Sequence, residues 1–331
     1  MAAAKSGKSG LDEFGRIARY FAPLAAPGAL GLLDDAALID GPPGEQYVLT
    51  TDTIVEGVHF LPGDPPDLVA RKLLRVNLSD LAAKGAVPVG YLLTTILPRD
   101  RGEAWLASFT KGLAADQREF GIALLGGDSV ASASPAALSV AAIGRVGAGK
   151  AVLRGGARPG DDIYCSGTLG DAALGLKVLR DELVQLDAPA RNFLAGRYRL
   201  PQPRLKLGQG LAGLAHATID ISDGLVADLG HICDVSAVGA TIEAALVPLS
   251  PALRLALKAE PSLLVAALTG GDDYELLFTA PPQAAPGLAA LAADCQVALT
   301  KIGVIEPGRG VSVVDSAGAA LDIAQGGYRH F

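Results

Sequence analysis

Apolar and polar residues alternate with two different periods along the first half of the chain, and these periods predict both strands and helices. Apolar residues from 14 to 21 recur three and four positions apart, which predicts a helix that begins at Leu11 and ends before Pro23 and Pro27. The further predicted helices are 67–76, with Asp67 as N-cap, a second helix after Ser79, and 103–120, and the predicted strands are 36–40, 47–51, 89–97, 122–125 (short and buried) and 137–146.

A Gly-rich segment then interrupts this pattern. Residues 147–161 contain five glycines and one proline, and they predict a link between two domains, with Arg154 inside it. Strands are predicted after it at 163–165, 217–221, 274–279, 297–305 and 311–315, with helices from the turn at 166–170 to about Leu186, at 203–207 and at 224–233. The expected organisation is a disordered N-terminus at 1–10, an N-terminal domain at 11–150 and a C-terminal α/β domain at 151–331.

Composition excludes several classes of protein. The net charge is −7 and aromatic residues make up 5% of the 331 residues, so neither a phosphate-backbone binder nor a base-stacking surface is expected, and no nucleic-acid partner. Cys165, Cys233 and Cys295 are far apart and predict neither a zinc site nor a disulfide framework. Residues 1–10 lack the apolar core of a secretory signal, and no run reaches the ~18 apolar residues of a membrane span, so a cytoplasmic protein without a membrane partner is expected.

Two nucleotide-binding patterns fail for lack of context. The GKS triplet at 7–9 has no preceding strand, and Ala2 stands where a Walker A loop needs glycine. The GQGLAG stretch at 208–213 follows a predicted helix rather than a strand, so close helix packing explains its glycines better than a dinucleotide site.

Short acidic stretches are the strongest chemical signal. Carboxylates stand near Gly, Ser or Thr, most of them where a predicted strand gives way to a helix or loop, at 34–35, 50–53, 79–80, 126–128, 220–223 and 270–273. Each stretch alone also fits a solvated loop or a helix N-cap. Together they fit Mg²⁺, because this cation prefers oxygen ligands and buried carboxylates need a partner, while basic residues are few nearby. Stretches 76–81 and 219–224 also echo one another, each with Ser-Asp where a helix is expected to begin, although chance similarity remains an alternative.

These stretches resemble, in order, the motifs of the thiamine-monophosphate kinase family, which belongs to the aminoimidazole-ribonucleotide-synthetase-like ATP-binding superfamily. The matching segments are GLLDDAA at 31–37, TTDT at 50–53, HF at 59–60, VNLSDLAAKGA at 76–86, GGD at 126–128, IDISDGL at 219–225 and GGDDYEL at 270–276. The resemblance implies a two-domain PurM-like fold of the α/β (α+β) class. In it the N-terminal domain forms a dimeric β-barrel, so a homodimer is expected.

The resemblance also implies roles for individual residues and a reaction. The expected reaction is direct in-line phosphoryl transfer from ATP to thiamine monophosphate, giving thiamine diphosphate, with several Mg²⁺ ions. The implied metal-site residues are Asp35, Thr50, Thr51, Asp52, Asp80, Asp220 and Asp223, of which Asp52 and Asp80 are the expected catalytic residues; the implied ATP contacts are Gly127, Asp128, Arg154 and Ser222; and the implied substrate contacts are His59, Asp272 and Tyr328.

Alternatives remain open at three of these residues. Asp272 stands where the family often has Glu, so its substrate contact is one methylene shorter. A hydrogen-bonded histidine at a strand end also explains His59, and an apolar plug that fixes the chain terminus also explains Tyr328. For the whole chain, the alternatives are another ATP-using enzyme of the superfamily or a non-catalytic nucleotide-binding maturation protein.

Overall fold

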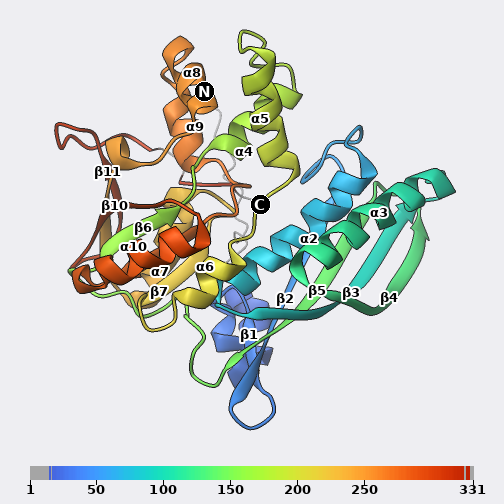
Figure 1. The fold of residues 1–331 in the computed structure, drawn as a ribbon, viewed down its shortest axis with the longest axis horizontal. Coiled ribbons are helices and arrows are strands. Elements are labelled where there is room, and N and C mark those ends of the chain that lie inside the picture. The colour runs from blue at the N-terminus through green and yellow to red at the C-terminus, as the bar shows by residue number, and fades with distance from the viewer. Residues whose placement is uncertain (1–14, 16, 324–325, 329–331) are drawn as a thin grey trace, which may run out of the picture.

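The first of two sheets holds five strands, in the order β1-β2-β5-β3-β4 (Figure 1). The computed structural model describes residues 15, 17–323 and 326–328, so the predicted disorder of residues 1–10 lies outside the described residues. All neighbouring strands are antiparallel except β3 and β4, which are parallel. The strands are β1 (Ala37–Asp40), β2 (Glu45–Val55), β3 (Val87–Pro98), β4 (Ala123–Ser132) and β5 (Ala137–Gly147).

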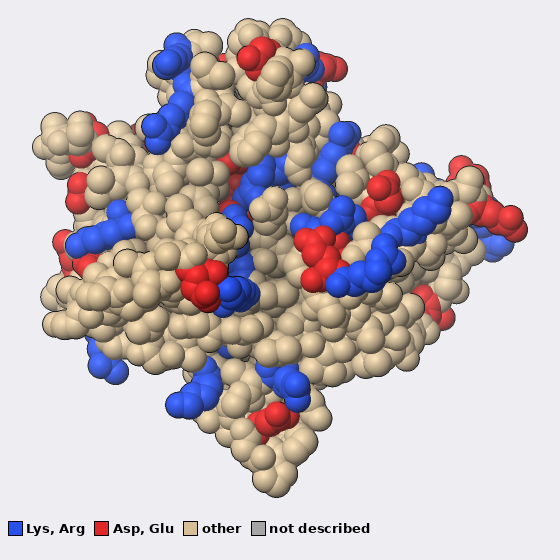
Figure 2. All heavy atoms as spheres, viewed as in Figure 1, with Lys and Arg blue, Asp and Glu red and all other residues tan. Residues whose placement is uncertain are grey.

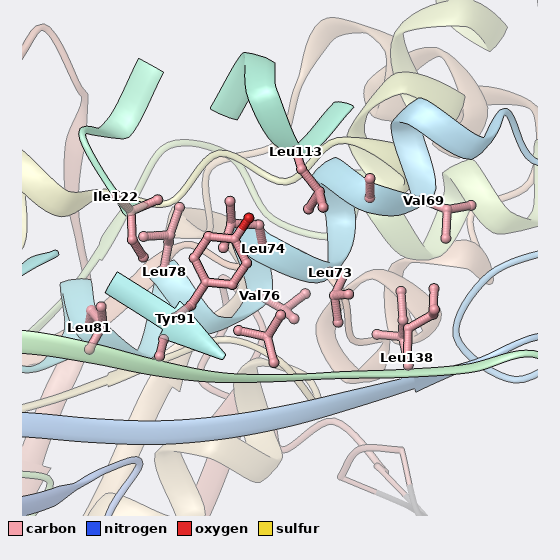
Figure 3. Close-up of a cluster of buried hydrophobic side chains, with 14 of the residues drawn as sticks. Val69, Leu73, Leu74, Val76, Leu78, Leu81, Tyr91, Leu113, Ile122 and Leu138 are labelled. Carbon is pink, nitrogen blue, oxygen red and sulfur yellow. The ribbon is translucent and has the colours of Figure 1, made fainter. Parts of the chain in front are cut away.

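Two helices, α2 (Pro66–Ala83) and α3 (Glu103–Phe120), cover one face of this sheet. Figure 3 shows Leu73 of α2 close to Leu138 of β5, with Leu74 and Leu78 farther along α2 and Leu113 of α3 on the other side of the cluster. All five side chains belong to one buried cluster. Burial of each such side chain contributes about 1.5–3 kcal/mol, so this core fixes α2 against the sheet.

Helix α2 corrects two predictions. It is continuous from Pro66 to Ala83, although two helices were expected, and Asp67 lies in its first turn rather than at its N-cap. The N-cap is Pro65, which makes no side-chain cap hydrogen bond. Ser79 and Asp80 therefore lie inside a helix. The continuous run of buried residues on α2 outweighs the local preference of Ser and Asp for helix starts.

The opposite face of the sheet is exposed along β3 and β4 in the described residues. Strand β4 was expected to be short and buried, but nine of its ten residues are exposed because it forms the sheet edge. Leu92 and Ile96 of β3 and Val130 of β4 are also exposed, at 46%, 37% and 46%. Within the described chain this sheet is open, and it does not close on itself into a barrel.

The second sheet holds six strands in the order β11-β8-β10-β6-β9-β7. The strands are β6 (Asp162–Ser166), β7 (Ala217–Asp220), β8 (Gly239–Glu243), β9 (Leu276–Ala280), β10 (Leu299–Glu306) and β11 (Gly310–Val314), and the helices are α4 (Asp171–Leu179), α5 (Ala188–Arg199), α6 (Leu205–Gly210), α7 (Leu225–Ser236), α8 (Pro251–Ala259), α9 (Leu263–Thr269) and α10 (Ala285–Cys295). In Figure 1, α4, α5, α8 and α9 stand above this sheet in the view shown.

Two helix predictions are corrected by these bounds. The helix after 166–170 ends at Leu179 rather than near Leu186, and Asp181 just beyond it has a left-handed backbone, with φ of 57°. The helix expected over 11–21 appears, in its described part, as a π-helical turn (Ile17–Phe21), followed by two 3-10 turns (Ala22–Leu24 and Pro27–Leu32).

Gly208 supports the packing explanation of the GQGLAG motif at 208–213, because a Cβ there would lie 1.9 Å from the Ala82 carbonyl oxygen.

Charged groups on the surface are mixed in sign. On the face drawn in Figure 2, Lys and Arg side chains lie among Asp and Glu, and the described residues form no broad basic patch there. None of the helices in the described part of the chain combines the length and the apolar character that a membrane crossing requires.

Candidate functional site

Three carboxylates from distant parts of the sequence meet where α2 approaches both sheets. Asp35 precedes β1, Asp80 lies on α2, and Asp220 ends β7. One oxygen from each lies within 4.8 Å of the others. Because α2 packs against β2 on one side and β7 on the other, it brings the two domains' acidic residues together. The structure therefore brings together three of the expected metal-site residues.

Strand β2 adds Thr50 and Asp52 to this group. The Thr50 hydroxyl donates a hydrogen bond to Asp80, and the Asp52 amide donates to Asn77 Oδ1 at 3.1 Å. Thr51 differs, since side chains alternate along a strand. Its side chain is exposed on the opposite face and donates to the Val140 carbonyl at 3.0 Å, so only its main chain is near the group.

Burial changes the proton affinity of these carboxylates. It raises the pKa of Asp52 to about 6, against a hydrogen bond with Asp80 that lowers it. It raises the pKa of Asp220 to about 7, with Asp35 as the second cause. Burial also raises the pKa of Asp80 well above its ordinary value, and three neighbouring carboxylates raise it further. Without a metal ion, Asp80 and Asp220 are therefore the carboxylates that retain protons near neutral pH.

Asp35 behaves differently because it has two basic partners, which the sequence analysis did not expect. Lys84 Nζ lies 2.9 Å from Asp35 Oδ2 and 2.6 Å from Asp34 Oδ1, while the Arg154 guanidinium pairs with the other Asp35 oxygen. Although burial acts to raise the pKa of Asp35, Lys84 and Arg154 hold it below its ordinary value. The expectation that few basic residues lie near these acids is wrong at this end of the site.

Asp223 belongs to a second group, next to the first. Its carboxylate lies within 4.8 Å of groups on Asp228 and His231. Asp228 accepts hydrogen bonds from the main-chain amides of residues 222, 223 and 224, each at 3.1 Å, and so fixes the turn before α7. This turn departs from the echo seen in the sequence, because Ser222 and Asp223 precede a helix whereas Ser79 and Asp80 lie within one.

A cavity of about 620 Å³ opens beside these carboxylates and lies between the two domains. Its lining includes six residues that were expected to bind metal, ATP or substrate. They are Asp52, His59, Ser222, Asp223, Asp272 and Tyr328. These residues come from both domains, so the cavity exists only when the domains pack as they do here.

At one side of the cavity, a buried lysine connects two of the expected substrate contacts. Lys72, on α2, is 2% exposed, and its ammonium donates to the His59 carbonyl at 2.9 Å and lies 3.3 Å from Asp272. His59 Nδ1 accepts a hydrogen bond from the Val55 amide at 3.0 Å, which fixes the ring after β2. The sequence analysis assigned no role to Lys72, and only its polar character on an apolar helix face marks it.

The loop that carries Asp272 is strained. Asp272 and Tyr274 both have left-handed backbones, with φ of 73° and 51°. Gly271 is required there, because a Cβ would lie 2.1 Å from the Ser222 carbonyl oxygen. Asp273 anchors the loop by accepting from the Gly170 amide at 2.6 Å. Such strain concentrates at functional sites, where surrounding contacts compensate for it.

Two tyrosines face the cavity. The Tyr328 amide donates to the Asp223 carbonyl at 3.0 Å, and Tyr328 is 50% exposed. Residues 329–331 lie outside the described part of the chain. Tyr274 also lines the cavity, and the sequence analysis gave it no role although it lies in the GGDDYEL segment.

Gly127 and Asp128 do not reach this site within one chain. Asp128 pairs in register with Thr94, then Ser139, then Thr53, across β4, β3, β5 and β2. At a strand spacing of about 4.8 Å, three steps place it roughly 14 Å from β2. This row lies on the uncovered face of the sheet, whereas Asp52 points toward α2.

Comparison with known proteins identifies the class that this fold and site define. Residues 33–146 match the N-terminal domain and residues 158–316 the C-terminal domain of the AIR synthase related proteins. Curated thiamine-monophosphate kinases are similar over most of the chain. The one from Caulobacter vibrioides is 41% identical over 91% of this chain and 86% of its own length, and the one from Escherichia coli K12 is 45% identical over 81% and 82%. The chain belongs to the thiamine-monophosphate kinase family.

A solved structure agrees with this assignment. The structure described as "AaThiL complexed with AMPPCP and TMP" has a TM-score of 0.85 and 33% identity, and the match covers 97% of each chain. The predicted two-domain PurM-like fold with mixed α/β sheets is confirmed, and so is the predicted family.

Proposed function

We propose that this protein transfers the γ-phosphoryl group of ATP to thiamine monophosphate, giving thiamine diphosphate and ADP. One observation carries the proposal: a single cavity is lined by Asp52 and Asp223, which lie beside the buried carboxylates, and also by Asp272 and Tyr328. The structurally similar relative is named as a complex with AMPPCP, an ATP analogue, and with TMP. Membership of the family supports the same pair of substrates here.

Magnesium fits the chemistry of the carboxylate group. Every donor in it is oxygen, and one oxygen each from Asp35, Asp80 and Asp220 lies within 4.8 Å of the others. Asp52, Asp80 and Asp220 would hold the ions, with Thr50 and the main chain of Thr51 beside them and Asp223 at the cavity side. When bound, Mg²⁺ offsets the repulsion between the negative donor and acceptor phosphates.

The acceptor needs no general base from the protein. A phosphate monoester has a second pKa near ~6, so its oxygen is already anionic at neutral pH. His59 suits a positioning role, because its Nδ1 already accepts from the Val55 amide. In this scheme Asp52 and Asp80 would hold the metal ions and do not act as bases. Ser222 and Arg154 contact ATP, and the phosphoryl group passes directly between the two substrates.

The far end of the cavity suits the thiamine moiety. Thiamine carries a cationic thiazolium ring, and an aromatic face attracts such a cation by roughly 0.5–2 kcal/mol. Tyr328 offers a half-exposed ring at the cavity, and Asp272 offers a carboxylate there. Asp272 also forms an ion pair with Lys72, which fixes the position of its carboxylate before the substrate binds.

We further propose a homodimer whose interface is the uncovered sheet face and the β4 edge. An edge strand leaves main-chain donors and acceptors unpaired, and exposed Leu92, Ile96 and Val130 add apolar area beside it. A second copy that extends the sheet at β4 into a shared barrel would place its Gly127 and Asp128 beside the first copy's β2. Gly127 and Asp128 would then contact ATP across the interface.

A coupled assay for ADP release tests the reaction. ADP should form with thiamine monophosphate as acceptor, and it should not form with thiamine or without an acceptor. Turnover with another acceptor would favour a different enzyme of the superfamily, and binding of ATP without any turnover would favour a nucleotide-binding maturation protein. We place the reaction in the cytoplasm, and cell fractionation followed by the same assay tests that location.

A further inference from the structure

Lys84 is a fully buried lysine inside the acidic site. It is the C-cap residue of α2 and is 0% exposed. Its ammonium lies 2.6 Å from Asp34 Oδ1 and 2.9 Å from Asp35 Oδ2, and it donates to the Thr218 carbonyl at 3.3 Å. Its partners thus come from both domains, and all of them are oxygens.

This set of neighbours resembles that of a bound cation. Burial of an unpaired ammonium is costly, so Lys84 stays inside the protein because carboxylates surround it. Asp35 is also a member of the three-carboxylate group with Asp80 and Asp220. The positive charge of Lys84 therefore acts on the same group that suits Mg²⁺, and it is present whether or not metal is bound.

We propose that the Lys84 ammonium is a built-in counter-ion of the carboxylate site, and that it takes one cation position that Mg²⁺ would otherwise occupy beside Asp35. Lys84 is then a positioning residue, which holds Asp34 and Asp35 in place and reduces the number or affinity of metal ions at that end. This inference rests on the magnesium site of the proposed function, but it makes a separate claim about charge.

Removal of the Lys84 charge should change Mg²⁺ affinity and the stability of the metal-free protein in opposite directions. A fixed positive charge beside Asp35 repels a divalent ion, and the interaction between charges a few ångströms apart is strong in a buried site. Removal of Lys84 should therefore tighten Mg²⁺ binding, while it should destabilise the metal-free protein because Asp34 and Asp35 lose their partner. A purely structural role would weaken both properties together.

The test compares wild type with Lys84→Met, which keeps the side-chain length and removes the charge. Isothermal titration with Mg²⁺ should show affinity on the order of tenfold tighter, or one additional ion, in the variant. Melting in EDTA should show a lower temperature for the variant, and saturating Mg²⁺ should recover more of its stability than it adds to wild type. Lys301→Met is the matched control, since Lys301 pairs with Asp162 at 2.6 Å outside the site, and its Mg²⁺ titration should match wild type.

Unchanged or weaker Mg²⁺ binding in Lys84→Met would overturn the inference, and so would the absence of Mg²⁺ binding to wild type. If Lys84→Met does not fold, Lys84→Gln, which retains hydrogen-bond donors without the charge, decides by the same titration. These readouts do not depend on turnover. A protein that binds Mg²⁺ as expected here but does not phosphorylate thiamine monophosphate would refute the proposed function alone.

Discussion

The protonation of the buried carboxylates predicts that the metal-free protein loses stability as pH rises. Burial raises the pKa of Asp220 in the folded protein to about 7, against an ordinary value of 3.8. Between these values the folded state binds the proton and the unfolded state does not, so the free energy of unfolding falls with rising pH across this window. The contribution is largest below pH 4 and is lost by about pH 7.

The size of the effect follows from the same values. Between about pH 5.5 and the Asp220 pKa of about 7, the free energy of unfolding falls by about 1.4 kcal/mol for each pH unit. Over this range the loss that Asp220 causes amounts to roughly 2 kcal/mol. Asp52, with a pKa of about 6, adds a smaller contribution of the same sign. Asp273 lies outside the carboxylate group, and burial raises its pKa to about 8. It therefore adds a pH dependence of stability that wild type and a site variant share, and the difference between the two proteins removes it.

The variant that isolates the site is Asp220→Asn, whose amide resembles the protonated acid at every pH. We expect wild type in EDTA to lose roughly 2 kcal/mol more than Asp220→Asn between about pH 5.5 and pH 8, measured by urea unfolding. Mg²⁺ should reverse this loss in wild type at pH 8, because it binds the folded state alone. Asp315→Asn, which alters a turn outside the site, is the control and should keep the wild-type slope.

Equal pH slopes for wild type and Asp220→Asn would refute this reasoning, and so would a wild-type stability that rises with pH in EDTA. Either result would mean that the carboxylates are ionised without a metal. The positive charges of Lys84 and Arg154 would then suffice to balance the whole group.

Three further predictions test the rest of the site. Asp52→Asn and Asp80→Asn should each lower kcat at least about 100-fold with the circular dichroism spectrum unchanged, since loss of a metal ligand costs several kcal/mol of transition-state stabilisation; near-normal turnover at saturating Mg²⁺ would show that the metal lies elsewhere. Tyr328→Ala should raise KM for thiamine monophosphate about 3- to 30-fold and leave KM for ATP nearly unchanged, while Tyr328→Phe should be mild because the ring binds the cation; equal weakening of both substrates would favour the plug. Light scattering should give the dimer mass, and a mixture of inactive Asp52→Asn and Asp128→Ala chains should recover roughly one quarter of wild-type activity by random assortment into dimers; no recovery would mean that each chain forms its own complete site.

Local patterns in the sequence were enough for most of the elements and for the family. Glu103–Phe120 was predicted with its observed bounds, because Trp105, Phe109 and Leu113 recur at helical spacing, and in the structure Gly121 is its left-handed C-cap. The carboxylates at 35, 52, 80 and 220 were recognisable because each stands in a short motif beside Gly, Ser or Thr. Such signals depend only on neighbours in the chain, so one sequence contains them.

Other features depend on contacts between distant residues. No local pattern shows that Lys84 pairs with Asp34 and Asp35, or that Lys72 connects His59 with Asp272, because each lysine stands in an ordinary helical sequence. The continuity of α2 through Ser79 and Asp80 also follows from burial against both sheets, which outweighs the local preferences of those residues.

The sequence by itself determined the acidic motifs, the alternation of strands and helices, and the resemblance to a kinase family. Only the tertiary structure decided which acids share one site, which of them already have a cation, and that Asp128 lies across the sheet from Asp52. The physical reason is that proton affinity and ion pairing depend on burial and on distance in space. The packing of α2 between the two sheets sets both of these, and it joins residues that lie more than one hundred positions apart.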